Sequence, residues 1–223
     1  MLSKSMFKSM RDALQQGIYA VINPFVRFLI RIGVTPNVVT TIGFLGNFAA
    51  ATLFTIVGYD AAETGEIHWP LVTIAGGVII LFSLFDMLDG QVARLGNMVS
   101  RFGAMYDSVL DRYCELLTLG GIAYFLFGAG CQWGAIITFL ALIGSVMVSY
   151  VRARAEGLGI ECKIGFMQRP ERVVVTALAS LASGISCSLL VLAIAMGVIA
   201  LFANLTAFAR LSHCRKALEN GKR

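Results

Sequence analysis

The interpretation of this chain depends on one stretch, Asp86-Met-Leu-Asp89-Gly90-Gln-Val-Ala93-Arg94, followed after eight residues by Gly103-Ala-Met-Tyr-Asp107-Ser-Val-Leu-Asp111. Its aspartates are spaced i, i+3 in the first half and i, i+4 in the second, and both spacings put side chains on one face of a helix. Two such helices facing each other would bring four carboxylates together, and these would repel unless a cation compensated them. Because hard divalent cations prefer oxygen ligands, the pattern predicts a Mg²⁺ or Mn²⁺ site formed by Asp86, Asp89, Asp107 and Asp111.

The composition argues against the alternative that these aspartates are ordinary solvated charges. The chain has 223 residues, of which 57% are hydrophobic and only 14% are charged, whereas about a quarter of the residues in a soluble domain are charged. This composition is typical of a membrane protein. Ionisable side chains inside a membrane segment are functional-site candidates, so the surroundings favour a functional site.

The net charge and the cysteines exclude other classes of protein. The formal charge is +5, but the basic residues form no soluble basic domain, so we expect no nucleic-acid partner. Positive charge beside apolar segments is typical of the cytoplasmic rim of a membrane protein. The five cysteines are scattered without a C-x-x-C pair, which favours reduced thiols over a disulfide framework or a zinc site.

The apolar segments predict an all-α integral membrane protein with six transmembrane helices preceded by an N-terminal interfacial amphipathic helix. The expected spans cover residues 36–57, 70–95, 101–127 and 133–150, with two more in 173–211 divided near Gly184. Residues 4–33 are basic and are interrupted at Pro24, which suits a helix at the membrane interface, although residues 17–33 could also insert. The predicted organisation is an interfacial segment (1–35), a six-helix domain (36–211) and a basic cytoplasmic tail (212–223).

The distribution of charge predicts the topology. All 18 Lys and Arg fall at the N-terminus, in 94–112, in 152–172, or from Arg210 onward. With six spans these four regions lie on one side, as the positive-inside rule requires, and the three opposite connections contain no Lys or Arg. We therefore expect a multi-pass protein of the cell membrane, with both termini and the aspartates on the cytoplasmic side.

The motif Asp-x-x-Asp-Gly-x-x-Ala-Arg-x8-Gly-x3-Asp-x3-Asp resembles the signature of the CDP-alcohol phosphotransferases, and every fixed position is present. These are integral membrane enzymes that transfer a phosphatidyl-type group from a CDP-linked donor to an alcohol. The resemblance implies CDP-diacylglycerol as donor, CMP as leaving group, two divalent ions and a homodimer. It assigns the general-base role to Asp111, which would accept the proton of the attacking hydroxyl.

The resemblance also implies a nucleotide-binding region. The segment Thr35-Pro36-Asn37-Val-Val-Thr40 opens the first span and is similar to a family segment whose polar side chains line the nucleotide pocket. As an alternative, it is a plain helix start with Pro36 in the first turn. The residues implied on the donor side are Asn37, Thr40, Asp86, Asp89, Gly90, Ala93, Arg94 and Gly103.

A basic cluster on the expected cytoplasmic side, after the fourth span and at the end of the sixth, bears on the acceptor. Arginine binds phosphate through two parallel hydrogen bonds, so its predominance suggests a phosphate pocket. The alternative is simple topology with contacts to anionic lipid. The candidate acceptor residues are Arg152, Arg154, Arg169, Arg172 and Arg210.

Residues 149–156 and 169–172 resemble the phosphatidylinositol-phosphate synthases of prokaryotes, which implies inositol 1-phosphate as acceptor. The chain departs from them at Arg152, where lysine is frequent, and at Gln168, where glutamate is expected. Related enzymes use glycerol 3-phosphate or another polar alcohol, so those acceptors remain open. A divalent-cation transporter is a further alternative, but the sequence shows neither inverted repeats nor broken mid-membrane helices, and the basic cluster would repel a cation.

Overall fold

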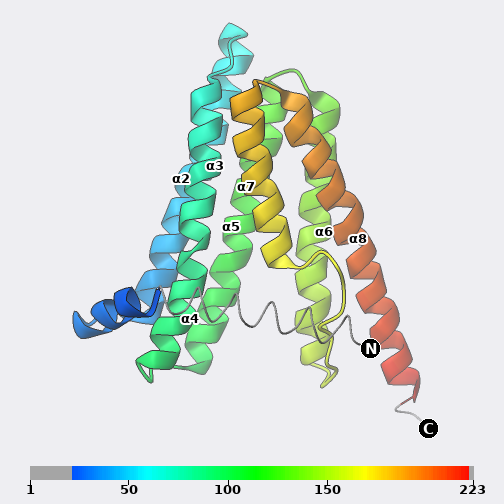
Figure 1. The fold of residues 1–223 in the computed structure, drawn as a ribbon. Coiled ribbons are helices and arrows are strands. Elements are labelled where there is room, and N and C mark those ends of the chain that lie inside the picture. The colour runs from blue at the N-terminus through cyan, green and yellow to red at the C-terminus, as the bar shows by residue number, and fades with distance from the viewer. Residues whose placement is uncertain (1–21, 221–223) are drawn as a thin grey trace, which may run out of the picture.

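The computed structural model describes residues 22–220, and every regular element in that part of the chain is an α-helix (Figure 1). Residues 22–31 are helical and precede the bundle. The remaining helices are α2 (Pro36–Thr64), α3 (Trp69–Ser83), α4 (Phe85–Leu95), α5 (Arg101–Gly128), α6 (Gln132–Glu156), α7 (Arg169–Ser186) and α8 (Leu189–Asn220).

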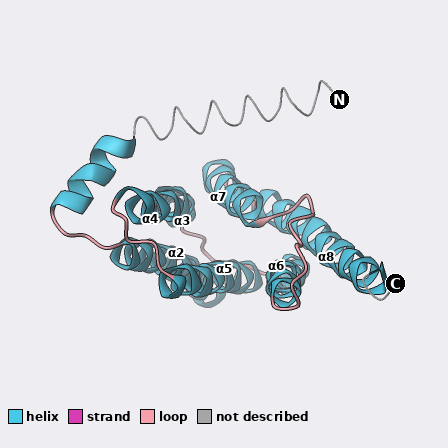
Figure 2. Cartoon of the chain, turned by 90° about the horizontal axis from the view of Figure 1, so that it is seen from below, coloured by secondary structure: helices cyan, strands magenta, loops and turns pink. Residues whose placement is uncertain are grey.

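The bundle has two layers, seen along its axis in Figure 2. One layer contains α2, α5 and α6, and the other contains α3 with α4, α7 and α8. The layers pack closely where α2 meets α3 and where α6 meets α8. Between these two contacts, α5 and α7 face each other without extensive backbone packing. The interior of the bundle is therefore widest between α5 and α7.

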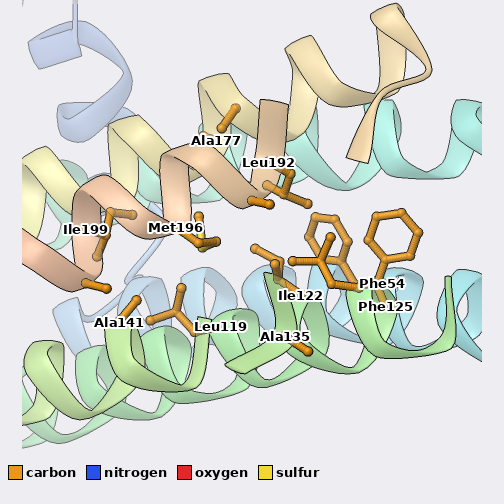
Figure 3. Close-up of a cluster of buried hydrophobic side chains, with 14 of the residues drawn as sticks. Phe54, Leu119, Ile122, Phe125, Ala135, Ala141, Ala177, Leu192, Met196 and Ile199 are labelled. Atoms are coloured by element: carbon orange, nitrogen blue, oxygen red, sulfur yellow. The ribbon is translucent and has the colours of Figure 1, made fainter. Parts of the chain in front are cut away.

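A hydrophobic cluster fills one end of this interior (Figure 3). Phe54 of α2 and Phe125 of α5 are fully buried, and the Trp69 ring meets Phe125 edge-on. Met196 and Ile199 of α8 complete the cluster from the other layer. Many large apolar side chains point outward instead, which suits a lipid-facing surface more than an aqueous one.

Glycines allow neighbouring helices to approach closely. A Cβ on Gly121 of α5 would lie 2.7 Å from the Ala51 carbonyl oxygen of α2. A Cβ on Gly76 of α3 would lie 2.7 Å from the Leu181 nitrogen of α7. Small residues at helix contacts are characteristic of membrane bundles, because helices in lipid associate through close van der Waals packing and not through the hydrophobic effect.

Four helices of the described part are long and apolar enough to cross a membrane: Pro36–Thr64, Trp69–Leu95, Gln132–Glu156 and Leu189–Glu219. The second of these joins α3 and α4. The helices α5 and α7 do not meet this criterion of length and apolar composition, because they carry the charged residues of the site. They nevertheless lie in the same bundle. The all-helical fold and its membrane character are thus confirmed, while six spans remain a prediction.

The two ends of the bundle differ in charge. The connections α2–α3, α5–α6 and α7–α8 lie at the upper end in Figure 1 and contain no Lys or Arg. The α4–α5 turn, the 157–168 loop and the end of α8 lie at the lower end. The helix of residues 22–31 lies across that lower end, with Val26 buried against Val39, Leu88 and Val92. The rest of the predicted interfacial segment, residues 1–21, is outside the described residues.

Two predicted boundaries differ from the structure. The expected span 70–95 is divided at Leu84, where the Ser83 hydroxyl donates to the Ile80 carbonyl and the rings of Phe82 and Phe85 stack. A hydroxyl bonded to the preceding turn offers that turn an alternative to the backbone ladder. The predicted tail from residue 212 is helical as far as 220, because α8 continues without interruption.

Candidate active site

The four aspartates lie on two neighbouring helices near the lower end of the bundle. Asp86 and Asp89 belong to α4, which begins directly after the bend at Leu84. Asp107 and Asp111 belong to α5, whose start is fixed by the Ser100 hydroxyl accepting a hydrogen bond from the Gly103 nitrogen at 2.9 Å. An N-cap of this kind stabilises the first turn, so it also fixes the register of the two aspartates that follow.

Each helix contributes one aspartate to each of two cavities. The inner cavity lies between α5 and α7, is narrow, and is bordered by Asp86 and Asp111. The outer cleft has about 670 Å³ of empty volume beside the start of α2 and is bordered by Asp89 and Asp107. The carboxylates therefore line two neighbouring spaces, so a substrate in either space would meet two of them.

A guanidinium from α7 joins the two inner aspartates. The Arg169 Nη2 atom lies 2.8 Å from Asp86 Oδ2 and 2.5 Å from Asp111 Oδ1. One cationic atom thus bridges both carboxylates, which shows that their oxygens converge closely enough to share a cation. The side-chain exposures of 24% for Asp86 and 11% for Asp111 place this contact largely away from solvent.

The donor set fits a hard divalent cation. Within the described residues, no three His, Cys, Asp or Glu side chains are already gathered as a metal cluster. The four candidate metal ligands are nevertheless all carboxylates. Asp107 lies close enough to Asp86 and Asp89 for their charges to repel each other. Oxygen-only ligation is what Mg²⁺ and Mn²⁺ prefer, and a bound cation would take over the charge compensation that Arg169 provides in this structure.

The outer cleft brings together the residues that the sequence pointed to as nucleotide-binding. It is lined by Asn37, Thr40, Asp89, Gly90, Ala93, Arg94, Gly103 and Asp107, so Asp86 alone of that predicted set lies elsewhere. The Thr40 hydroxyl is 2.7 Å from Asp89 Oδ2 and 3.1 Å from the Pro36 carbonyl oxygen. Thr40 therefore orients a candidate metal ligand from the helix that opens the fold.

Two glycines keep this cleft open. A Cβ on Gly90 would lie 3.4 Å from Arg94 Nη2, and a Cβ on Gly103 would lie 3.4 Å from Asn37 Oδ1. The glycines thus leave room for the polar ends of Arg94 and Asn37 at the cleft wall. Larger residues would push those groups away from any bound ligand.

Two arginines of the predicted acceptor cluster, Arg169 and Arg172, line the inner cavity, and the other three lie outside it. Arg172 is 2% exposed, donates through Nε and Nη2 to both Glu115 oxygens, and reaches the Met167 carbonyl at 3.1 Å. Arg210 is also 2% exposed and donates to the carbonyls of Ile164 and Val148. In this structure both are tied to neighbouring groups of the protein.

The other arginines of that cluster lie elsewhere. Arg152 pairs with Glu156 at 2.9 Å on the surface of α6. Arg154 is exposed at a largely apolar groove between the ends of α6 and α8. Arg169 contacts Asp86 and Asp111, so it is the member of the predicted cluster that reaches the candidate catalytic groups.

Sequence reasoning did not identify Glu115 and Arg112 as members of the site. Glu115 continues the i, i+4 spacing of Asp107 and Asp111, so a helical-face argument extended by one turn would have found it. Arg112 follows Asp111 directly, and its Nη2 lies 3.7 Å from Asp111 Oδ2. No spacing rule singles out Arg112, because its role depends on what lies opposite α5.

Comparison with known proteins places this geometry in a family. The profile described as CDP-alcohol phosphatidyltransferase matches residues 33–210, which contain both cavities. The phosphatidylinositol phosphate synthase of Mycobacteroides abscessus is 35% identical over 166 residues, covering 74% of this chain and 70% of that protein. The archaetidylinositol phosphate synthase of Pyrococcus horikoshii is 34% identical over 194 residues, covering 86% and 90%.

Solved structures agree with these sequence relatives. The crystal structure of the Mycobacterium tuberculosis phosphatidylinositol phosphate synthase with CDP-DAG bound has a TM-score of 0.76 and 31% identity, covering 87% of this chain and 94% of that chain. A crystal structure of the same enzyme in complex with manganese and citrate has a TM-score of 0.75 and 31% identity, covering 86% and 87%.

Proposed function

The chain belongs to the CDP-alcohol phosphatidyltransferase family, and from this we propose that it transfers the phosphatidyl group of CDP-diacylglycerol to a hydroxyl of inositol 1-phosphate and releases CMP. One observation carries the proposal: the residues resembling the family's nucleotide site line a single cleft, beside carboxylates from both α4 and α5. Relatives named as phosphatidylinositol and archaetidylinositol phosphate synthases support an inositol phosphate as acceptor.

We propose that Asp86, Asp89, Asp107 and Asp111 hold divalent cations, Mg²⁺ or Mn²⁺, and that two ions bind. Such ions supply neutralisation of the pyrophosphate charge and polarisation of the phosphorus. The manganese-bound structure of the M. tuberculosis relative supports this assignment. Thr40 then acts as a positioning residue, because its hydroxyl fixes the orientation of the Asp89 carboxylate.

In this proposal the outer cleft and the inner cavity bind different parts of the reacting complex. The outer cleft binds the cytidine nucleotide, with Asn37 and Arg94 as polar contacts and Gly90 and Gly103 providing space. The inner cavity admits the acceptor, where Asp111 accepts the proton of the attacking hydroxyl. The oxygen of that hydroxyl attacks the lipid-linked phosphorus, the phosphorus–oxygen bond to CMP breaks, and CMP leaves through the cleft.

Arg169 is the arginine best placed to recognise the acceptor's phosphate. It borders the inner cavity and already contacts Asp111. A planar guanidinium can release a carboxylate and bind phosphate through two parallel hydrogen bonds. Glycerol 3-phosphate carries the same phosphate, so it is the principal alternative acceptor, and another polar alcohol would have to do without this contact.

The charge distribution supports a location for the site in the membrane. The basic residues of the described chain lie toward the end of the bundle that holds the aspartates, which the positive-inside rule places in the cytoplasm. We propose six membrane spans with that end cytoplasmic, so that the nucleotide enters from water while the acyl chains stay in lipid. A homodimer is proposed from family membership.

The decisive experiment is CMP release by purified protein in detergent with CDP-diacylglycerol and Mg²⁺ or Mn²⁺. Inositol 1-phosphate, free inositol and glycerol 3-phosphate are offered separately. Release with inositol 1-phosphate alone is the expected result. Release only with another alcohol would reject the acceptor and keep the aspartate chemistry, whereas no release with any acceptor would reject the transfer reaction as proposed.

A further inference from the structure

A groove between the C-terminal ends of α6 and α8 is separate from the candidate active site. It has a volume of about 360 Å³, and it shares no lining residue with the inner cavity or the outer cleft. Its wall is mostly apolar, and the large side chains on it are exposed, namely Tyr150, Leu158, Leu211 and Leu218. An open apolar wall of this kind is typical of a surface that an apolar partner covers.

The lengths of α6 and α8 place this groove at the surface of the bilayer. A helix needs about 20 residues to cross the hydrocarbon core. Counted from Gln132 and Leu189, the two helices therefore reach the headgroup region near residues 152 and 209. The groove is lined by residues 150–158 of one segment and 211–219 of the other, so both sides of it begin at this depth. A lipid molecule is the apolar partner that is present there.

The charges at the groove favour an anionic partner. Of its two arginines, Arg215 lies 2.7 Å from Glu219, which also borders the groove, so these two charges compensate each other. Arg154 is exposed, and none of the described carboxylates forms an ion pair with it. The nearest acidic residue along α6, Glu156, pairs with Arg152 at 2.9 Å. The groove therefore keeps one uncompensated positive charge, on Arg154.

We propose that this groove binds an anionic phospholipid of the cytoplasmic leaflet, with an acyl chain along the apolar wall and the phosphate at Arg154. Basic pockets between helices at the cytoplasmic face are suited to anionic lipid headgroups. A zwitterionic lipid carries a cation beside its phosphate, so it gains less from Arg154. A second copy of the chain is less suitable, because a two-fold contact at this groove would bring one Arg154 toward another.

A lipid in this groove would also stabilise the loop of residues 157–168. The inner wall of the groove is formed by Val151, Ala155 and Cys214, which pack with Cys162 and Ile160 of that loop. The loop leads directly into α7. A lipid that holds the ends of α6 and α8 together therefore supports the loop as well, so binding should be visible as a gain in thermal stability.

Titration with lipid, followed by thermal unfolding, tests the proposal. Purified protein in a neutral detergent is titrated with short-chain phosphatidylglycerol or with phosphatidylcholine of the same chain length, and phosphatidylglycerol should raise the unfolding temperature more. Arg154→Gln should weaken the apparent affinity for phosphatidylglycerol about fivefold, as expected for one basic residue at an anionic lipid, and Arg154→Lys should restore it. Arg27→Gln is the matched control and should respond like wild type. Arg27 is exposed on the helix of residues 22–31 and borders none of the three cavities.

The outcomes separate this inference from its rivals and from the proposed function. Equal stabilisation by the two lipids, or an Arg154→Gln response equal to that of wild type, would overturn the lipid site. A changed oligomeric state of Arg154→Gln, without any response of wild type to phosphatidylglycerol, would overturn it in favour of a second copy of the chain. The titration needs neither CDP-diacylglycerol nor turnover, so a protein that releases no CMP could still confirm the lipid site.

Discussion

At the residue scale, the roles of the charged side chains follow from what each one faces. Asp86 of α4 and Asp111 of α5 come from opposite layers of the bundle and are joined by Arg169 of α7, which contacts both. Arg172 lies three residues after Arg169 and is held by Glu115, which is 57 positions away in sequence. The same residue type on one turn of one helix therefore contacts the candidate catalytic aspartates in one case and pairs with Glu115 in the other.

Asp107→Asn tests the metal-ligand role at this scale. We expect metal-dependent CMP release to fall by more than about 100-fold, because even indirect partners of metal ligands change activity by 10- to 100-fold. Ser108→Ala is the control, since Ser108 is the exposed neighbour on the same turn. CMP release and thermal unfolding are measured on both proteins, and a fully active Asp107→Asn enzyme would exclude Asp107 as a ligand.

At the element scale, close helix contacts fix the positions from which α4, α5 and α7 present their charges. The glycine-mediated approach of α3 to α7 sets the distance of α7 from the rest of its layer. The Arg172–Glu115 pair then ties α7 to α5 across the interior. A shift of α7 would carry Arg169 away from the aspartates. The packing of α3 on α7 therefore helps to keep Arg169 in contact with Asp86 and Asp111.

Adjacent glycines on α3 provide a test of this packing. A Cβ on Gly76 would lie 2.7 Å from a backbone nitrogen of α7, whereas a Cβ on Gly77 would have no neighbour within 4 Å. We expect Gly76→Ala to destabilise the fold by about 1–3 kcal/mol through overpacking. Gly77→Ala should be neutral or should stabilise by up to about 1 kcal/mol, because alanine favours the helix. Thermal unfolding in detergent measures both, and equal effects would contradict the proposed contact.

At the scale of the whole molecule, the two ends of the bundle have different chemistry. The basic connections lie at the end that carries the site, and the connections without Lys or Arg lie at the other. The helix of residues 22–31 covers the side of α4 at the basic end through Val26. From this asymmetry we expect the end that carries the aspartates to face the cytoplasm, where a water-soluble nucleotide would meet a lipid.

Labelling of single cysteines tests this orientation. In a variant without the natural cysteines, we expect Glu66→Cys to react with a membrane-impermeant maleimide on intact cells and Lys163→Cys to react only after permeabilisation. The reason is that the two exposed residues lie at opposite ends of the bundle. Reaction of both from the same side would exclude an odd number of spans between them, and thus the three spans that the proposed topology puts there.

The sequence by itself determined the helical class, the membrane character and the outer cleft. Apolar length and charge spacing are local properties, so the helix starts near residues 36 and 101 could be predicted, whereas α7 begins at Arg169, before the apolar segment expected from residue 173. The aspartate spacing predicted the shared faces of α4 and α5 because helical periodicity is fixed by the backbone. The division of the helix at Leu84 could not be predicted, since it coincides with the hydrogen bond of Ser83 and the stacking of the Phe82 and Phe85 rings.

Only the tertiary structure decided which cation meets which carboxylate. Arg169, Arg172 and Arg210 look alike in sequence, yet one bridges Asp86 and Asp111, one is sealed against Glu115, and one holds the carbonyls of Ile164 and Val148. A guanidinium at the end of a long, flexible side chain finds its partner according to which helix lies opposite and at what depth. That information is carried by the packing of α5 and α7, so the sequence alone could not assign a separate partner to each of these arginines.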